Sequence, residues 1–315
     1  MSRALIFPGQ GSQQVGMGKE LLESFAEARE VFERVDDALS QSLSKIILEG
    51  PEYDLNLTAN TQPALMAVSM AVVEILKKQG GLKIEDICSY VAGHSLGEYS
   101  ALTAAGALEI EETARLLRIR GDAMQKAVPF GVGSMAAILG LDFEDVKAIA
   151  QEAANGEVCE AANDNSTGQV VVSGHAGAVA AAISLAQEKG AKKAVELPVS
   201  APFHCALMQP AADAMRDALA DANMQKPVVP VVANVTANAT QDPEEIRDLL
   251  VRQVTGTVRW RESVLWMKDQ GVEQMVELGA GKVLSGLVRR IDREIACESV
   301  GTPDQVEAII EKLKE

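Results

Sequence analysis

The sequence predicts an α/β protein in which a large domain with a mainly parallel sheet carries an inserted small domain with a sheet of its own. In the first half of the chain, short apolar runs alternate with longer helical patterns, which is typical of parallel α/β folds. Between residues 134 and 198 the rhythm changes to strand, helix, two strands, helix and strand. With 315 residues, 47% of them hydrophobic, the chain can bury a substantial core.

The strands expected in the large domain are apolar runs that end in glycine, proline or polar loops. They are residues 4–7, 89–93, 228–235 and 273–279. Helical patterns separate the first two, as the crossover between parallel strands requires.

The small domain is expected to be ferredoxin-like, because its elements follow the order βαββαβ. The expected elements are strand 135–141, helix 142–154, strands 158–162 and 169–174, helix 176–190 and strand 192–199. The glycines of segment 131–133 and Pro198 mark the two crossings between domains. We therefore expect the large domain to span 1–127 and 199–315, and the small domain to span 128–198.

Net charge and cysteine content limit the kinds of partner that the protein can bind and the cellular compartment in which it is expected. A formal net charge of −16 argues against a broad nucleic-acid or anionic-membrane surface, since both need excess Lys and Arg. Partners are therefore expected to be small molecules or proteins. Cys88, Cys159, Cys205 and Cys297 are scattered, without a spacing that suits a metal, which predicts free thiols and no metal site.

The apolar segments predict a cytoplasmic protein. The N-terminus has only four consecutive apolar residues, too few for a signal peptide. No apolar run approaches the ~20 residues of a transmembrane helix.

Ser95 is the candidate nucleophile. It stands in a G-x-S-x-G frame between Gly93 and Gly97, after an apolar strand and before a run of helix formers. This is the context of a nucleophile elbow, a tight turn that exposes the hydroxyl at a helix N-terminus. Backbone N–H groups there can stabilise developing negative charge. The alternative is an accidental glycine-rich turn.

The chain has three histidines, so the general base can be sought by elimination. His94 is the neighbour of Ser95 on a tight turn and should point away from it. His175 lies at a strand-to-helix junction of the small domain, where capping is the ordinary role. His204 follows a proline-bounded loop where the chain re-enters the large domain, and neutral imidazole can take a hydroxyl proton near neutral pH. Its alternative role is that of a buried structural histidine.

The position of His204 argues against an ordinary α/β-hydrolase. In that fold the chain order is serine, acid, histidine, with the histidine close to the C-terminus. Here a long segment follows His204, and no Asp or Glu stands out as its partner. A backbone carbonyl could orient the imidazole instead.

Arg120 lies on the apolar stripe of a predicted helix. It shares this stripe with Leu116, Leu117, Met124 and others, whereas the remaining charged side chains fall on the opposite face. A guanidinium is costly to bury alone, so Arg120 should meet an anion. That anion is either a buried Asp or Glu in a structural salt bridge, or a substrate carboxylate such as that of a malonyl group.

The glycine-rich segment after the first strand, FPGQGSQQVGMGKE, does not fit a nucleotide site. Its spacing lacks the third glycine of a dinucleotide fingerprint and the Ser or Thr of a P-loop. A tight loop with Gln10 between two glycines can still turn backbone amides toward a reacting carbonyl.

Taken together, these motifs resemble the malonyl-CoA:acyl-carrier-protein transacylase family, relatives of the acyltransferase domains of fatty-acid and polyketide synthases. FPGQGSQ, GHSLGEY, RG-AMQ, GQVV-SG, APFH and ELGAGKVL occur in the family's order over nearly the whole chain. The resemblance implies a large α/β-hydrolase-like domain with an inserted ferredoxin-like domain. It also implies a transacylase without a bound cofactor that serves fatty-acid biosynthesis.

The same resemblance assigns roles to individual residues. Ser95 would be the nucleophile, His204 the base and Arg120 the ligand of the malonyl carboxylate. The backbone amides of Gln10 and Leu96 would form the oxyanion hole. Two further roles would fall to Gln253, whose main-chain carbonyl orients the histidine, and to Phe203, whose ring favours malonyl over methylmalonyl.

The implied reaction is ping-pong transfer of malonyl from malonyl-CoA to the phosphopantetheine thiol of acyl carrier protein. Carrier proteins are acidic, as this chain is, so a local basic patch should receive them. The candidates are Lys189, Lys192 and Lys193, or Arg289 and Arg290. We expect a monomer. The rival functions are a serine thioesterase or esterase, which would not need Arg120, and a non-catalytic carrier-binding scaffold.

Overall fold

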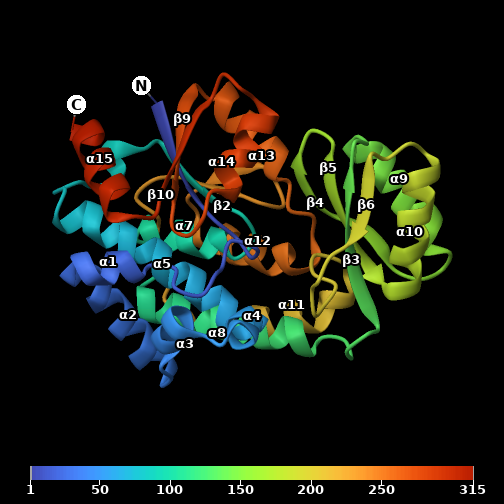
Figure 1. Ribbon diagram of the computed structural model, residues 1–315, viewed down its shortest axis with the longest axis horizontal. Coiled ribbons are helices and arrows are strands. Elements are labelled where there is room, and N and C mark those ends of the chain that lie inside the picture. Colours follow the sequence, from blue (N-terminus) through green and yellow to red (C-terminus); the bar gives the residue numbers. More distant parts are fainter. Residues whose placement is uncertain (1, 315) are drawn as a thin grey trace.

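A six-stranded sheet forms the centre of the larger part of the molecule, here described for residues 2–314 from a computed structural model (Figure 1). Its strands follow the order β10-β9-β1-β2-β7-β8. All neighbouring pairs are parallel except β7 with β8. The strands are β1 (Ser2–Phe7), β2 (Tyr90–Gly93), β7 (Val231–Ala233), β8 (Asn238–Thr240), β9 (Val272–Leu278) and β10 (Ala296–Val300). The predicted α/β class with a mainly parallel sheet is therefore confirmed.

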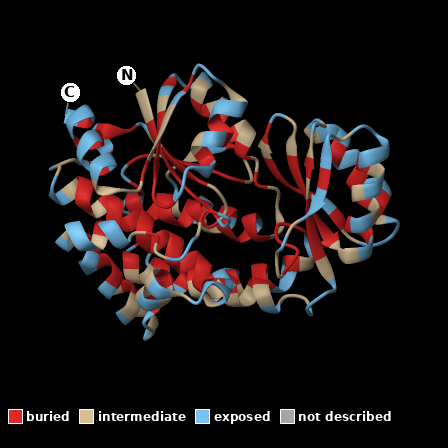
Figure 2. Cartoon of the chain, viewed as in Figure 1, coloured by how far each residue is buried: buried red, intermediate tan, exposed pale blue. Residues whose placement is uncertain are grey.

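Helices cover both faces of this sheet, so its strands are apolar on both sides. In β1, Leu5 and Phe7 pack into the larger core, whereas Ala4 and Ile6 pack with Trp260 on the other face. Figure 2 shows the resulting band of buried residues. The helices are α1 (Lys19–Ser24), α2 (Ala26–Leu39), α3 (Leu43–Glu49), α4 (Glu52–Asn56), α5 (Thr58–Lys78), α6 (Ile84–Ile87), α7 (Gly97–Ala104), α8 (Ile110–Lys126), α11 (Gln209–Ala220), α12 (Pro243–Thr255), α13 (Trp260–Asp269), α14 (Val283–Ile291) and α15 (Pro303–Lys314).

Helix α5 is long and apolar enough, by length and composition, to cross a bilayer. It has 21 residues, and its most apolar window has a mean hydropathy of 1.2. Polar residues interrupt its apolar ones, so α5 is not an unbroken apolar run of that length. In addition, 89% of that window is buried inside the protein, as in the core helix of a globular domain.

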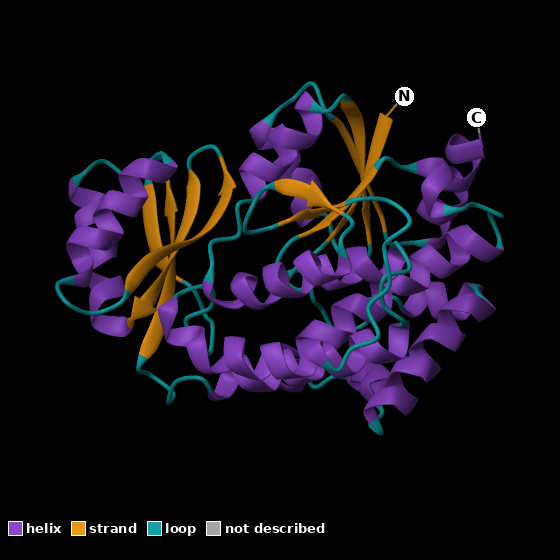
Figure 3. Cartoon of the chain, turned by 180° about the vertical axis from the view of Figure 1, so that it is seen from behind, coloured by secondary structure: helices purple, strands orange, loops and turns teal. Residues whose placement is uncertain are grey.

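The small sheet lies apart from the large one and is antiparallel, with the order β4-β5-β3-β6. Its elements are β3 (Gly133–Leu139), α9 (Phe143–Ala154), β4 (Cys159–Ser166), β5 (Gln169–His175), α10 (Ala176–Glu188) and β6 (Lys193–Glu196). This is the βαββαβ order predicted from the sequence. Figures 1 and 3 show α9 and α10 on the outer side of the sheet, where Val170 and Val172 help to build a separate core. Val171 points the other way, toward the larger core.

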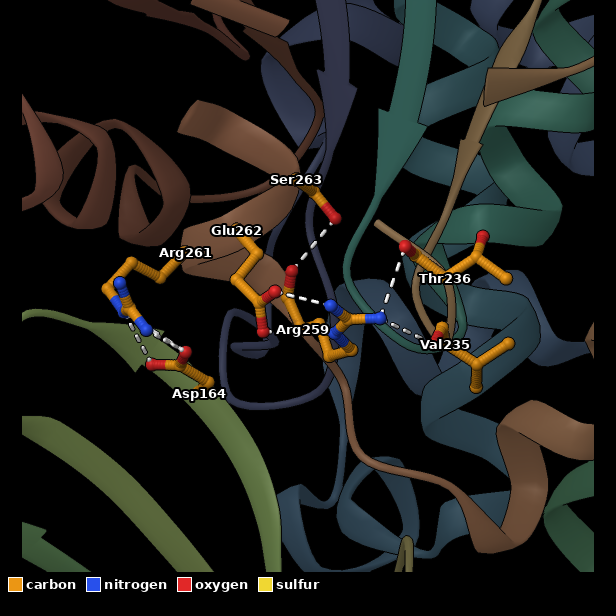
Figure 4. Close-up of polar contacts among 7 residues, drawn as sticks. All are labelled: Asp164, Val235, Thr236, Arg259, Arg261, Glu262 and Ser263. Atoms are coloured by element: carbon orange, nitrogen blue, oxygen red, sulfur yellow. Dashed lines mark hydrogen bonds and ion pairs between the residues drawn. The ribbon is translucent and has the colours of Figure 1, made fainter. Parts of the chain in front are cut away.

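A polar junction ties β4 to the segment before α13 (Figure 4). The backbone N–H of Asp164 donates to the carbonyl of Val258 (2.9 Å), and the N–H of Val258 donates to the carbonyl of Ala162 (2.9 Å). The fully buried carboxylate of Asp164 accepts from Nε of Arg261 at 3.0 Å for each oxygen. Arg259 anchors the same segment through the carbonyls of Val235 and Thr236. The small sheet is thereby tied to the start of α13, and that segment is tied to the loop after β7, beside the site described next.

Candidate active site

Ser95 occupies a sharp turn between β2 and α7, with a left-handed φ of 54°. Both flanking glycines are required by contact. A Cβ on Gly93 would lie 1.9 Å from the backbone of Gly97, and a Cβ on Gly97 would lie 2.3 Å from the carbonyl oxygen of Phe7. Such distances leave no room for a side chain. The G-x-S-x-G frame therefore forms a tight strand-turn-helix elbow in which both glycines are sterically required.

His204 is the histidine that contacts Ser95, as expected by elimination. Its Nε2 lies 2.8 Å from Ser95 Oγ, and its Nδ1 lies 2.8 Å from the main-chain oxygen of Gln253. Since a carbonyl can only accept, Nδ1 carries the proton and Nε2 is left to accept from the serine hydroxyl. Burial, assisted by the charge of Arg120, lowers the pKa of His204 to about 3. The imidazole is therefore neutral at physiological pH.

The other two histidines have partners of their own. His94 Nε2 lies 2.7 Å from Oδ1 of Asn165 on β4. His175 Nδ1 accepts the backbone N–H of Val158 at 3.0 Å, within the small sheet. Neither of these contacts involves the serine.

Arg120 on α8 is buried, with 1% of its surface exposed. Its guanidinium donates to Gln62 Oε1 (2.8 Å), Gln253 Oε1 (2.9 Å) and Ser95 Oγ (3.1 Å). These acceptors are neutral, and within residues 2–314 no carboxylate pairs with this guanidinium in a salt bridge. Its Nε is buried without a hydrogen-bond partner there. The structural salt bridge weighed from the sequence is therefore wrong, and the cation is available to an incoming anion.

The side chains meet in a cavity of about 360 Å³ between the two sheets. Gln10, Leu96 and Phe203 line it together with the serine, the histidine and the arginine. Within residues 2–314, the backbone N–H groups of Gln10 and Leu96 donate to no backbone acceptor. The small sheet contributes Asn163 and Asn165 to the opposite wall. The fold thus brings together the seven residues whose site roles were predicted from the sequence, namely Gln10, Ser95, Leu96, Arg120, Phe203, His204 and Gln253.

Besides Asn163 and Asn165, sequence reasoning missed three polar residues that support the reacting groups. Gln62 on α5 holds Arg120, and Asn234 follows β7 and accepts the N–H of Ser95 at 2.7 Å through Oδ1. Glu98 on α7 is 1% exposed and accepts from Gln253 Nε2 at 2.8 Å. Asn234 could have been found from its place after the carboxyl end of a parallel strand, where sites form in α/β folds. Glu98 and Gln62 carry no such signal, because Glu and Gln are common in helices and are usually exposed there.

Comparison with known proteins assigns this arrangement to a family. Residues 4–314 match the family model described as acyl transferase domain. The chain is 44% identical to the malonyl CoA-acyl carrier protein transacylase of Bacillus subtilis, over 99% of this chain and 97% of that protein.

Solved structures agree. The acyl-carrier-protein S-malonyltransferase of Bartonella henselae is 57% identical, with a TM-score of 0.98 over the whole of both chains. A malonyl-transacylase solved in complex with a type II polyketide synthase acyl-carrier protein is 41% identical, with a TM-score of 0.96 over 99% of this chain and 100% of that one. The chain therefore belongs to the acyl transferase domain family, among the malonyl CoA-acyl carrier protein transacylases.

Proposed function

We propose that this enzyme transfers a malonyl group from malonyl-CoA to the phosphopantetheine thiol of acyl carrier protein, through a malonyl ester on Ser95. The observation that carries the proposal is the position of Ser95 Oγ, which contacts both a neutral imidazole and a buried guanidinium. The imidazole suits proton transfer from a hydroxyl, and the guanidinium suits a free carboxylate on the acyl group. The names of the relatives support the same substrate pair.

In the first half-reaction, His204 Nε2 takes the proton of Ser95 as Oγ attacks the thioester carbon. The resulting oxyanion is stabilised by the backbone N–H groups of Gln10 and Leu96. Its collapse breaks the C–S bond, and CoA leaves with the proton from His204. In the second half-reaction the carrier thiol gives its proton to His204 and attacks the ester carbon. The C–O bond then breaks, and Ser95 Oγ recovers the proton.

The acyl carboxylate is bound by Arg120 in this scheme. The guanidinium is already held by Gln62 and Gln253, so it needs little reorganisation to receive an anion. A malonyl carboxylate would replace the contact with Ser95 Oγ and so free that oxygen for attack. Phe203, 8% exposed and on the cavity wall, crowds a methyl branch at the α-carbon. One methyl discriminates by about 1–3 kcal/mol, so methylmalonyl-CoA should be a poor substrate.

Intact-mass measurement after brief incubation with malonyl-CoA or acetyl-CoA tests the proposal. Wild type should gain a malonyl adduct, Ser95→Ala should gain none, and Arg120→Ala should lose its preference for malonyl over acetyl. The adduct should then pass to added acyl carrier protein. Free malonate in place of an adduct would support the rival thioesterase, and no reaction at all would support a non-catalytic scaffold.

We also propose the finer description of the fold. The large sheet with its Ser95 elbow supports an α/β-hydrolase-like domain at 1–127 and 199–315. The element order, the sheet order and the separate core support a ferredoxin-like domain at 128–198. The four free cysteines and the burial of α5 support a cytoplasmic location.

Docking of the carrier is proposed to use a local basic patch, because the chain as a whole is acidic. Lys192 and Lys193 are exposed at the start of β6, and Arg289 and Arg290 are exposed at the end of α14. Lys189 is engaged by Glu152. Replacing both Lys192 and Lys193 by Glu should raise KM for the carrier and leave KM for malonyl-CoA unchanged. An unchanged carrier KM would reject this patch.

A further inference from the structure

Glu98 lies behind the reacting groups and is joined to them through two amides. Its Oε2 accepts from Gln253 Nε2 (2.8 Å) and from the backbone N–H of Asn234 (3.0 Å). Asn234 in turn holds the turn that carries Ser95, through the N–H of Ser95 (2.7 Å) and the carbonyl of Gly93 (2.7 Å). A single buried carboxylate oxygen therefore holds both the side-chain amide of Gln253 and the backbone amide of Asn234.

Gln253 is the point where the parts of the site meet. Its main-chain oxygen accepts from His204, and its side-chain Oε1 accepts from Arg120 at 2.9 Å. Its Nε2 donates to Glu98 and, at 3.0 Å, to the carbonyl of Ser95. An amide side chain can be placed in two orientations, and only the one in which Nε2 faces Glu98 turns Oε1 toward Arg120.

We propose that Glu98 is a positioning residue of the transfer reaction, which fixes the side-chain amide of Gln253 so that Arg120 is aimed at the acyl carboxylate. It also holds the turn of Ser95 through Asn234. The inference rests on the proposed function, because it concerns the same malonyl transfer. Without the carboxylate, Nε2 of Gln253 would lose its shortest acceptor and keep longer contacts such as that to the carbonyl of Ser95 at 3.0 Å, so the amide facing Arg120 would be held less firmly.

Charge supports the same role. Glu98 faces Arg120 across the Gln253 amide and both side chains are 1% exposed, so the carboxylate balances the guanidinium without occupying it. A direct ion pair would consume the hydrogen-bond donors that the substrate needs. Burial raises the pKa of Glu98 to about 7, although its bonds to Asn234 and Gln253 and the charge of Arg120 oppose that shift.

A buried glutamate elsewhere in the fold provides a matched control. Glu277 at the end of β9 is 0% exposed and accepts from the N–H groups of Leu284 and Ser285 and from Ser285 Oγ. It therefore caps α14 and does not belong to the cavity lining. Glu98→Gln and Glu277→Gln remove the same charge from equally buried places.

The experiment compares single-turnover acylation of Ser95 by malonyl-CoA and by acetyl-CoA, followed by intact mass and normalised to folded protein. Glu98→Gln should acylate with malonyl on the order of 100-fold more slowly, the effect expected of a small misplacement of reacting groups. Its preference for malonyl over acetyl should also fall by about tenfold or more. Glu277→Gln should lower Tm but keep both the rate and the preference of wild type.

Two outcomes would overturn the inference. One is a Glu98→Gln protein with wild-type rate and preference. The other applies if Glu98→Gln does not fold, and it is a Gln253→Met protein that keeps the wild-type preference for malonyl. This variant keeps the main-chain oxygen but removes the side-chain link between Glu98 and Arg120. If wild type forms no malonyl adduct, the proposed function fails instead, and the two failures are thereby distinguished.

Discussion

Arg120 Nη2 lies 3.1 Å from Ser95 Oγ, so a buried cation touches the atom that would carry the acyl group. The same guanidinium spans Gln62 and Gln253, which only a planar group with several donors can do. Arg120→Lys should therefore keep the charge but lose the geometry. We expect the kcat/KM ratio of malonyl-CoA to acetyl-CoA to fall roughly 10- to 100-fold, equivalent to about 1.4–2.8 kcal/mol. Arg115→Lys, at an exposed position of the same helix, should leave the ratio unchanged.

Gly97, the first residue of α7, should tolerate no side chain. In Gly97→Ala the new Cβ would lie 2.3 Å from the oxygen of Phe7, and the elbow would have to open. We expect a loss of about 1–3 kcal/mol or more in the free energy of unfolding, measured by urea denaturation. Gly286→Ala is the control, because its Cβ would meet nothing within 4 Å. That change in α14 should instead stabilise the protein by about 0.5–1 kcal/mol.

The junction between the sheets depends on the ion pair of Asp164 and Arg261. Arg261→Met would leave a fully buried carboxylate unpaired, at a cost of about 3 kcal/mol at pH 7. Burial already raises the pKa of Asp164, and the loss of Arg261 would raise it further. A carboxyl with a raised folded pKa loses its stabilising contribution as pH rises, so the deficit should be larger at pH 7 than at pH 4.

An exposed pair serves as the control for that experiment. Arg252 and Asp248 lie 3.4 Å apart on the surface of α12, and both are more than half exposed. Arg252→Met should cost less than about 1 kcal/mol at either pH. An equal cost for the two variants would mean that the junction is no stronger than a surface contact.

The loss of rate at low pH should follow the protonation of Glu98 and not that of His204. Burial lowers the pKa of His204 to about 3, so this imidazole stays neutral far below pH 6.5. Burial raises the pKa of Glu98 to about 7, and the groups that face it are Arg120, Tyr99, Asn234 and Gln253. The kcat/KM for malonyl-CoA should therefore fall as Glu98 takes a proton below about pH 7. In Glu98→Gln this fall should be absent, and its persistence near pH 6.5 would assign it to His204.

Sequence patterns were sufficient to predict the strands and helices whose apolar residues recur with a regular period. The four predicted strands of the large sheet and all six elements of the small unit are present, because apolar periodicity reflects burial directly. Strand β7 is shorter than expected, since Pro230 has no N–H to donate and Asn234 turns toward Ser95 and Glu98. Strands β8 and β10 were missed because short, polar edge strands lack the alternation of a half-buried strand.

Within the site, residues with a distinctive local pattern could be found and those that act through contact could not. Ser95 has its glycine frame, and Arg120 is a charge on an apolar stripe. Gln62 and Glu98 are ordinary polar residues until the fold places them beside a guanidinium or the amide that holds it. Their importance depends on partners far away in the chain, which no local window contains.

Ser95 and His204 both have left-handed backbones, with φ values of 54° and 58°, a region that favours glycine over either residue. Each conformation carries strain of about 1 kcal/mol or more. Glycine at either position would relieve the strain and abolish the chemistry. A glycine variant at either position is thus less strained than this protein. It would keep the fold but lose the proposed reaction. Backbone stability alone therefore does not account for the serine and the histidine at these two positions.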